Sequence, residues 1–101
     1  MAENITVKDN AGAHQFEAVV DGATAYVSYV LNGDQITYEH TVVPQELEGR
    51  GIGGQLAKAV LDDARTRGRT VVPHCSFIAG YIRRHPDYID IVDPDSRAAV
   101  Q

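Results

Sequence analysis

The sequence predicts an α+β fold in which an antiparallel three-stranded meander is followed by a β-α-β crossover, giving a mixed sheet with two main helices. Two patterns carry this prediction. Apolar residues alternate with a period of two in three successive segments between residues 15 and 43. They then recur with a helical period over residues 52–64, before a second apolar strand and a second helix.

Three strands are expected before the first helix. They cover residues 15–20, 24–31 and 35–43. Asp21-Gly22 and Asn32-Gly33 separate them, and both dipeptides are typical of tight hairpin turns. Pro44 should end the third strand, because proline cannot donate a hydrogen bond to the ladder.

The second half of the chain predicts two helices and two further strands. The first helix has an apolar stripe with a spacing of four residues: Ile52, Leu56, Val60 and Ala64. Gly68 is placed as its C-terminal glycine, and residues 69–72 read as a short buried strand. Ser76 is the expected N-cap of a second helix that ends before His85-Pro86. Residues 88–92 can form a last strand, and the crossover should be right-handed.

Length and composition predict a single domain over residues 1–101, with a core at 15–92. Residues 1–14 and 93–101 are expected to be loose, although Ile5 and Val7 can add a short edge strand. The net charge of −5 argues against general nucleic-acid binding. No apolar run is long enough to span a membrane, and the first residues show no secretory signal. A single cysteine excludes an internal disulfide, which fits a reducing cytosol, so we expect a cytoplasmic protein. The expected oligomeric state is a monomer or a weak homodimer.

Residues 48–54 contain four glycines at the junction between the third strand and the first helix. Main chain without side chains lets N–H groups converge on an anion, and a helix N-terminus adds partial positive charge. The segment is not a P-loop, because no Gly-Lys-Ser/Thr follows. It therefore predicts either a phosphate site or close packing of the helix on the sheet.

The segment from Pro44 to Leu56 resembles the acetyl-coenzyme A loop of the GNAT superfamily of N-acetyltransferases, whose pattern is Gln/Arg-x-x-Gly-x-Gly/Ala. Gly51 and Gly53 match its last two fixed positions. Glu48 stands at the first, where Gln or Arg is usual.

Two downstream motifs are similar to those of the small, single-domain GNAT-like subfamily. Residues 73–77 match Pro-x-Cys-Ser-aromatic, and residues 81–88 match Tyr-Ile-x-x-His-Pro-x-Tyr. The resemblance extends from about Ala18 to Val92.

The resemblance implies that acetyl-coenzyme A binds in a splay between the third strand and the strand at 69–72. Its amides would pair with the strand, and its pyrophosphate with N–H groups of the glycine turn. The implied cofactor-binding residues are Thr41, Val42, Val43, Gly49, Arg50, Gly51, Ile52, Gly53 and Gly54. Arg50 is the nearest cation, with Arg83 and Arg84 farther along the chain, although each alone is more typical of a solvated surface.

Cys75 is the first catalytic candidate, because it lies before a helix N-terminus, where a thiol pKa can fall. It can accept the acetyl group as a thioester, or it (or a tyrosine) can protonate the departing thiolate. The alternative is a small cysteine that fills core space.

Glu39 and His40 are the candidate bases, and they point to opposite faces of the third strand. His40 shares its face with core residues, so a buried histidine is favoured there; His85 is expected to fix a turn. No metal site is expected, because the spacing of the candidate ligands matches no familiar set: His40, His74, Cys75 and His85.

Three functions remain open at this level. The first is an acetyl-coenzyme A-dependent N-acetyltransferase that acts on an amine acceptor, possibly through Cys75. The alternative is a non-catalytic module that binds coenzyme A or acyl-coenzyme A with the same fold. The third is a structural α+β domain whose glycines serve packing alone.

Overall fold

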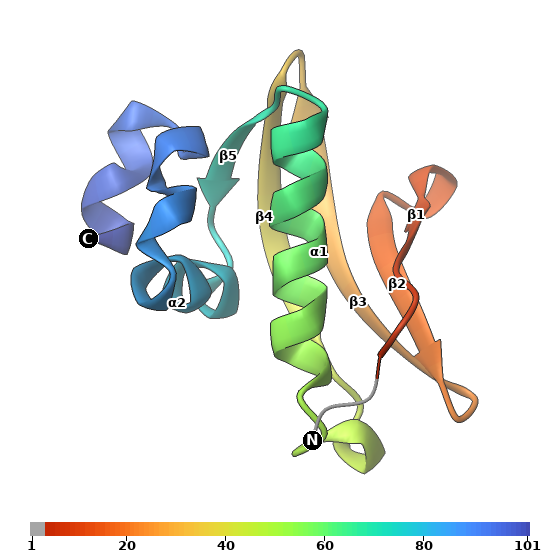
Figure 1. Ribbon diagram of the computed structural model, residues 1–101. Helices are drawn as coiled ribbons and strands as arrows, with labels where there is room; N and C mark the ends of the chain where they lie inside the picture. Colours follow the sequence, from red (N-terminus) through yellow and green to blue (C-terminus); the bar gives the residue numbers. More distant parts are fainter. Residues whose placement is uncertain (1–3) are drawn as a thin grey trace.

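The computed structural model describes residues 4–101 and shows a five-stranded sheet with the strand order β1-β2-β3-β4-β5 (Figure 1). The strands are β1 (Lys8–Asn10), β2 (Gln15–Val20), β3 (Ala23–Asn32), β4 (Gln35–Val42) and β5 (Thr70–Pro73). Neighbours are antiparallel except β4 and β5, which are parallel. The two main helices are α1 (Ile52–Thr66) and α2 (Ser76–Arg84). The predicted α+β class, with its meander and its β-α-β crossover, is confirmed.

Two tight turns join the strands of the meander. Asp21 and Gly22 both have positive φ, 51° and 81°, which is what a primed hairpin turn requires. The second turn lies one residue later than predicted, because Asn32 still pairs with Gln35. Gly33, with φ of 60°, therefore begins the turn itself.

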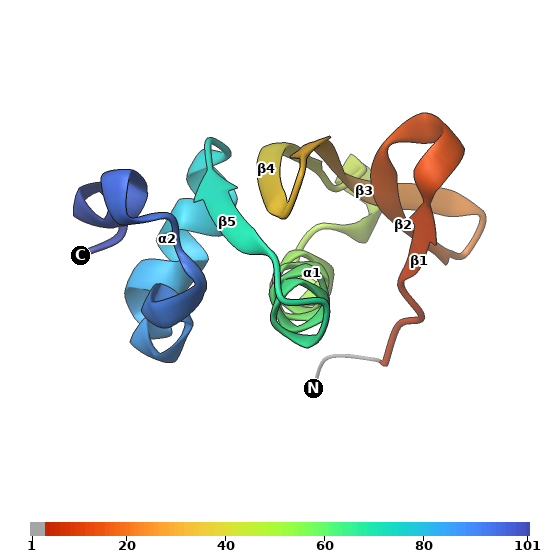
Figure 2. The ribbon, with the colours of Figure 1, turned by 90° about the horizontal axis from the view of Figure 1, so that it is seen from above.

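Helix α1 packs against one face of the sheet, and no helix of residues 4–101 covers the other face of β2 and β3 (Figure 2). Its predicted apolar stripe is buried, from Ile52 at 1% exposure to Ala64 at 0%. Gly68 follows the helix with φ of 68°, as expected for a C-terminal glycine. None of the described helices is both long and apolar enough to cross a membrane.

Helix α2 begins one residue earlier than predicted. Cys75 rather than Ser76 is the N-cap, because its main chain is still extended while its carbonyl accepts the first helical hydrogen bond, from Ala79 N at 3.0 Å. The helix ends at Arg84, before His85-Pro86, as predicted.

The expected last strand at residues 88–92 is wrong. Residues Pro86–Ile91 form the 3₁₀ helix η3, and only Val92 makes a bridge, to Val71 of β5. A short apolar run does not distinguish a strand from a helical segment. Here Pro86, with its φ restricted by the ring, starts a helical turn that carries Tyr88 into the core.

The chain ends are also more ordered than predicted, as far as residues 4–101 describe them. The edge strand forms at Lys8–Asn10, after Ile5 and Val7 rather than through them. At the other end, Pro94–Val100 forms the 3₁₀ helix η4, and Val100 is 1% exposed. Two further 3₁₀ turns are η1 (Ala11–Ala13) and η2 (Gln45–Leu47).

Candidate functional site

A β-bulge in β4 determines which side chains of this strand face the candidate site. Tyr38 lies opposite Tyr29, but the next pair along the ladder is His40 with Ser28, so Glu39 is an extra residue on β4. An extra residue reverses the alternation of side chains between the two faces. Before the bulge the even-numbered residues face the core, and after it the odd-numbered residue Thr41 does.

The bulge overturns the prediction that His40 is buried. His40 is exposed on the uncovered face rather than buried with Tyr38. Val42 is 39% exposed on that same face, so its side chain does not enter the site. Thr41 and Val43, by contrast, are half-buried and line a pocket.

The edge of β4 beyond the bulge is open. The ladder between β4 and β5 ends at the pair of Tyr38 with Pro73, and Cys75 N donates to Tyr38 O at 2.9 Å just past it. Figure 1 shows β5 diverging from β4 as it runs toward α2. Within the described chain, residues 40–42 pair with β3 alone. This is the predicted splay, and its free strand edge can accept an extended ligand.

The glycine turn borders the same opening. A pocket of about 490 Å³ joins the end of β4, the glycine turn, the start of α1 and one residue of α2. Its lining is Thr41, Val43, Leu47, Glu48, Gly49, Gly51, Ile52, Gly53, Gly54 and Phe77. Seven of the nine residues predicted to bind the cofactor are therefore brought together, and the exceptions are Val42 and Arg50.

The first turn of α1 presents main-chain donors. Gly51 is the N-cap with φ of 74°, and no side chain of residues 4–101 caps the helix there. Gly49, with φ of 80°, has the same left-handed conformation. The opening N–H groups of a helix have no partner within it. Together with the helix dipole they suit an anion.

No lysine or arginine lines this pocket among residues 4–101. Arg50 Nη1 donates to Asp21 Oδ2 at 2.9 Å, and Arg83 Nη1 donates to Ala99 O at 2.7 Å. Glu48 is the charged residue in the lining. An anion bound here would therefore rely on main-chain N–H groups.

Cys75 lies at the base of the splay, behind Thr41. Its Sγ is 3.1 Å from Thr41 Oγ1, and either group can be the donor. Cys75 is 7% exposed and does not itself line the pocket. Glu39 is exposed at the bulge, and no hydrogen bond in the described residues links it or His40 to the thiol.

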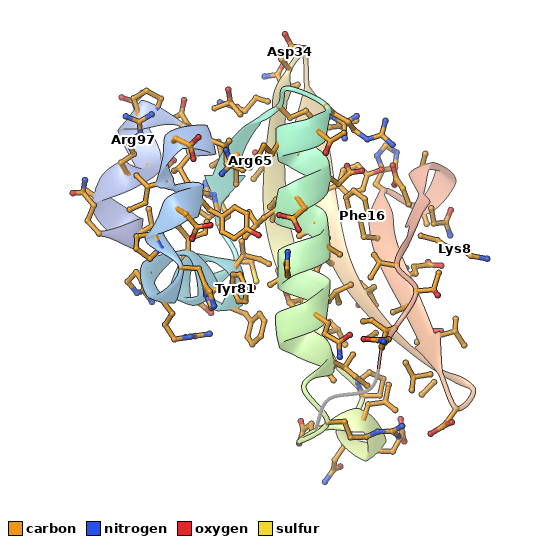
Figure 3. The ribbon with its side chains drawn as sticks, viewed as in Figure 1. Lys8, Phe16, Asp34, Arg65, Tyr81 and Arg97 are labelled. Carbon is orange, nitrogen blue, oxygen red and sulfur yellow. The ribbon has the colours of Figure 1, made fainter. Side chains whose placement is uncertain are left out.

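The tyrosines do not line the pocket in the described chain. Tyr38 donates to Val60 O and Tyr88 donates to Asp62 Oδ1, so both hydroxyls have partners outside the pocket. Burial raises the pKa of Tyr81, whose ring stacks on His85 with centroids 4.0 Å apart. His85 Nδ1 also lies 3.1 Å from Tyr81 O, consistent with its expected role at the end of α2. Figure 3 shows Tyr81 between α2 and α1.

Three lining residues are outside the predicted cofactor-binding set: Leu47, Glu48 and Phe77. Leu47 stands alone among polar residues in the connection after β4, yet it is 1% exposed. Phe77 is 39% exposed at the pocket, although the same helix buries Ile78 and Ile82. Its place in the Pro-x-Cys-Ser-aromatic motif was the one available signal. In residues 4–101 no cluster of three or more His, Cys, Asp or Glu side chains could hold a metal ion.

Comparison with known proteins relates this chain to a family, to a curated protein and to a solved structure. A family model described as GCN5-related N-acetyl-transferase matches residues 15–91. The mouse protein named Protein NATD1 is 30% identical over 95 residues, covering 89% of this chain and 86% of its own. A GCN5-like N-acetyltransferase candidate from Staphylococcus aureus, solved by NMR, has a TM-score of 0.69 and 29% identity, covering 90% of each chain. The chain therefore belongs to the GCN5-related N-acetyl-transferase family of enzymes.

Proposed function

We propose that this protein transfers an acetyl group from acetyl-coenzyme A to an amine acceptor. The observation that carries the proposal is that the first turn of α1 and the free edge of β4 border one pocket of about 490 Å³. A helix N-terminus suits a diphosphate, and an open strand edge suits a chain that contains amides. Coenzyme A carries both groups in one molecule.

The residues present fit this ligand through their main chain. We assign the pyrophosphate to N–H groups of Gly49 and of residues 51–54, and the amide-containing arm to the β4 edge at Thr41 and Val43. Val42 can take part only through its main chain, since its side chain is on the other face. Arg50 is not required for this assignment, because its ion pair with Asp21 directs it elsewhere.

The chemistry needs two proton movements. When bound, acetyl-coenzyme A supplies an activated acetyl thioester. A bond forms between the amine nitrogen and the acetyl carbon, the carbon–sulfur bond breaks, the nitrogen loses a proton and the sulfur gains one. We assign the proton donor to the Thr41–Cys75 pair, whose polar atoms lie 3.1 Å apart beside the open edge.

Glu39 is the proposed acceptor of the amine proton. It is exposed at the bulge, at the level where the β4–β5 ladder ends. His40 is the second candidate, and it is exposed as well. Direct transfer is favoured over a thioester on Cys75, because the thiol is 7% exposed and lies behind Thr41.

The test begins with ligand binding. Acetyl-coenzyme A should raise the thermal midpoint, and at a concentration 100 times Kd the gain is about 2.7 kcal/mol. Release of the coenzyme A thiol, followed with a panel of primary amines, then measures turnover. Absence of any stabilisation at millimolar ligand would overturn the proposal. Binding without turnover on any amine would instead support a non-catalytic coenzyme A-binding module.

Mass spectrometry separates the two chemical routes. After incubation with acetyl-coenzyme A and no amine, we expect no acetyl adduct on Cys75. Cys75→Ser should keep at least part of the activity, because a hydroxyl can still donate a proton there. An adduct on Cys75 that disappears when amine is added would contradict direct transfer and establish the thioester route.

A further inference from the structure

Phe77 is an exposed aromatic residue at a functional position. Five large apolar side chains are substantially exposed in the described chain: Val19, Val30, Leu31, Val42 and Phe77. The first four lie on strands of the meander, and none of them lines the pocket. Phe77 alone of the five lines the pocket, from the first turn of α2. Its 39% exposure is an unfavourable contact with water that a bound ligand would remove.

The ring is seated on the main chain of α1. A Cβ added to Gly53 would lie 2.8 Å from Phe77 Cζ, closer than Cβ atoms approach other heavy atoms, and 3.4 Å from Cε2. Gly53 thus leaves the space that the ring occupies. A Cβ added to the next residue, Gly54, would meet nothing within 4 Å. The two neighbouring glycines therefore serve different purposes.

The pocket lining combines apolar side chains with main chain that carries no side chain. Val43, Leu47 and Ile52 contribute the other apolar side chains of the lining. Gly49, Gly51 and Gly54 expose mainly peptide groups, which suit the charged part of a ligand. An occupant that satisfies both sets needs an anionic group joined to a partly apolar arm.

The geometry points to Phe77 as a ligand-contacting residue whose ring, held by Gly53, forms the apolar wall against which the thiol-terminated arm of coenzyme A packs. This inference rests on the proposed function. In this inference Phe77 and Gly53 favour ligands that carry the arm, and they do not bind the diphosphate.

The first test compares a complete and a truncated ligand by isothermal titration calorimetry. Phe77→Ala should raise the Kd for coenzyme A by about tenfold or more, as expected for losing a buried aromatic contact. ADP has the diphosphate but no arm, so its Kd should change less than about twofold. Phe77→Leu should lie between, because it keeps apolar contact. Val30→Ala, an exposed residue on a strand outside the pocket, is the matched control and should change neither Kd.

The second test asks why residue 53 is glycine. Gly53→Ala should weaken coenzyme A binding by displacing the ring. In the Phe77→Ala background the same substitution should have little further effect, because no ring remains to be displaced. If the two effects multiply instead, Gly53 serves the ligand directly and its pairing with Phe77 is refuted.

The outcomes separate this inference from the proposed function. If wild-type protein binds neither coenzyme A nor ADP, the proposed function fails. If coenzyme A binds the wild type and both Phe77 variants equally, the proposed function stands and the wall is refuted. Equal losses for coenzyme A and ADP would also refute it, since the ring would then not be specific to the arm. Circular dichroism of each variant monitors the fold, and Phe77→Leu is the readout if Phe77→Ala unfolds.

Discussion

Four glycines occur at the start of α1, and the structure distinguishes their purposes. Gly49 and Gly51 have φ of 80° and 74°, a region that side chains with a Cβ rarely adopt. Gly53 has an ordinary φ but contacts the Phe77 ring. Gly54 has neither constraint, although glycine in a helix costs about 0.5–1 kcal/mol relative to alanine. We therefore infer that position 54 is glycine because a ligand approaches it closely.

Gly54→Ala tests this attribution. The substitution should raise the free energy of unfolding by about 0.5–1 kcal/mol, because alanine favours the helix and its Cβ meets no protein atom. The same variant should bind coenzyme A more weakly. Urea denaturation and calorimetry on the one protein measure both effects, and a stabilised variant with unchanged affinity would contradict the attribution.

Gly51→Ala is the matched comparison on the same turn. Here the left-handed main chain opposes any Cβ, so the free energy of unfolding should fall by about 1 kcal/mol or more. The opposite signs at positions 51 and 54 would separate a conformational requirement from a ligand requirement.

At the scale of elements, side-chain interactions join α1 to the C-terminal turns. Tyr88 of η3 donates to Asp62 Oδ1 at 2.6 Å. Arg65 makes two hydrogen bonds to Asp90, at 2.8 and 2.9 Å, and its guanidinium lies 5.6 Å from the centre of the Tyr88 ring. Figure 3 shows Arg65 on the side of α1 that faces these turns. The segment expected to be a strand is thus fixed to the helix instead.

These contacts predict that the packing of η3 on α1 is sensitive to acid. Burial tends to raise the pKa of Asp62, but hydrogen bonds from Lys58 and Tyr88 outweigh it and lower the pKa. The hydrogen bond from Arg65 lowers the pKa of Asp90. A carboxylate with a lowered pKa stabilises the folded state above its unfolded pKa, about 3.9. That stability is lost as pH falls through the folded pKa.

Asp62→Asn should therefore reduce the dependence of stability on acid. Asparagine still offers an oxygen to Tyr88 but does not titrate. We expect the free energy of unfolding, measured by urea denaturation, to fall less between pH 6 and pH 3 in the variant than in the wild type. An identical fall in the free energy of unfolding of both proteins would show that Asp62 does not contribute to this acid sensitivity.

At the scale of the whole molecule, the C-terminal segment completes the core beside α2. Val100 is 1% exposed, Arg83 Nη1 donates to Ala99 O, and Arg97 Nε donates to Val92 O at 3.2 Å. The views in Figures 1 and 2 place this segment beside α2, on the opposite side of the molecule from β1. It is part of the packed structure and lies away from the residues that line the pocket.

Removal of residues 94–101 should consequently affect stability more than binding. Losing the buried Val100 side chain alone costs about 1.5–3 kcal/mol, and the chain end contributes further contacts. We expect a lower urea midpoint with the coenzyme A Kd unchanged at a temperature where the protein is folded. Deletion of the exposed Gln101 alone is the control and should change neither quantity.

The sequence by itself determined the fold class, the order of the six strands and helices from β2 to α2, and the position of the glycine turn. These follow from local physics: a period of two or of about four, hairpin dipeptides, and glycines before an apolar stripe. It also indicated the family, through motifs at residues 44–56 and 73–88.

Only the tertiary structure decided which side chains meet at the site. One extra residue at Glu39 reversed the faces of β4, which exposed His40 and turned Thr41 toward Cys75. A bulge depends on the register with β3, and no local pattern in β4 reveals that register. Gly53 of α1 and Phe77 of α2 are likewise 24 positions apart in sequence, and only the packing of the two helices brings them into contact.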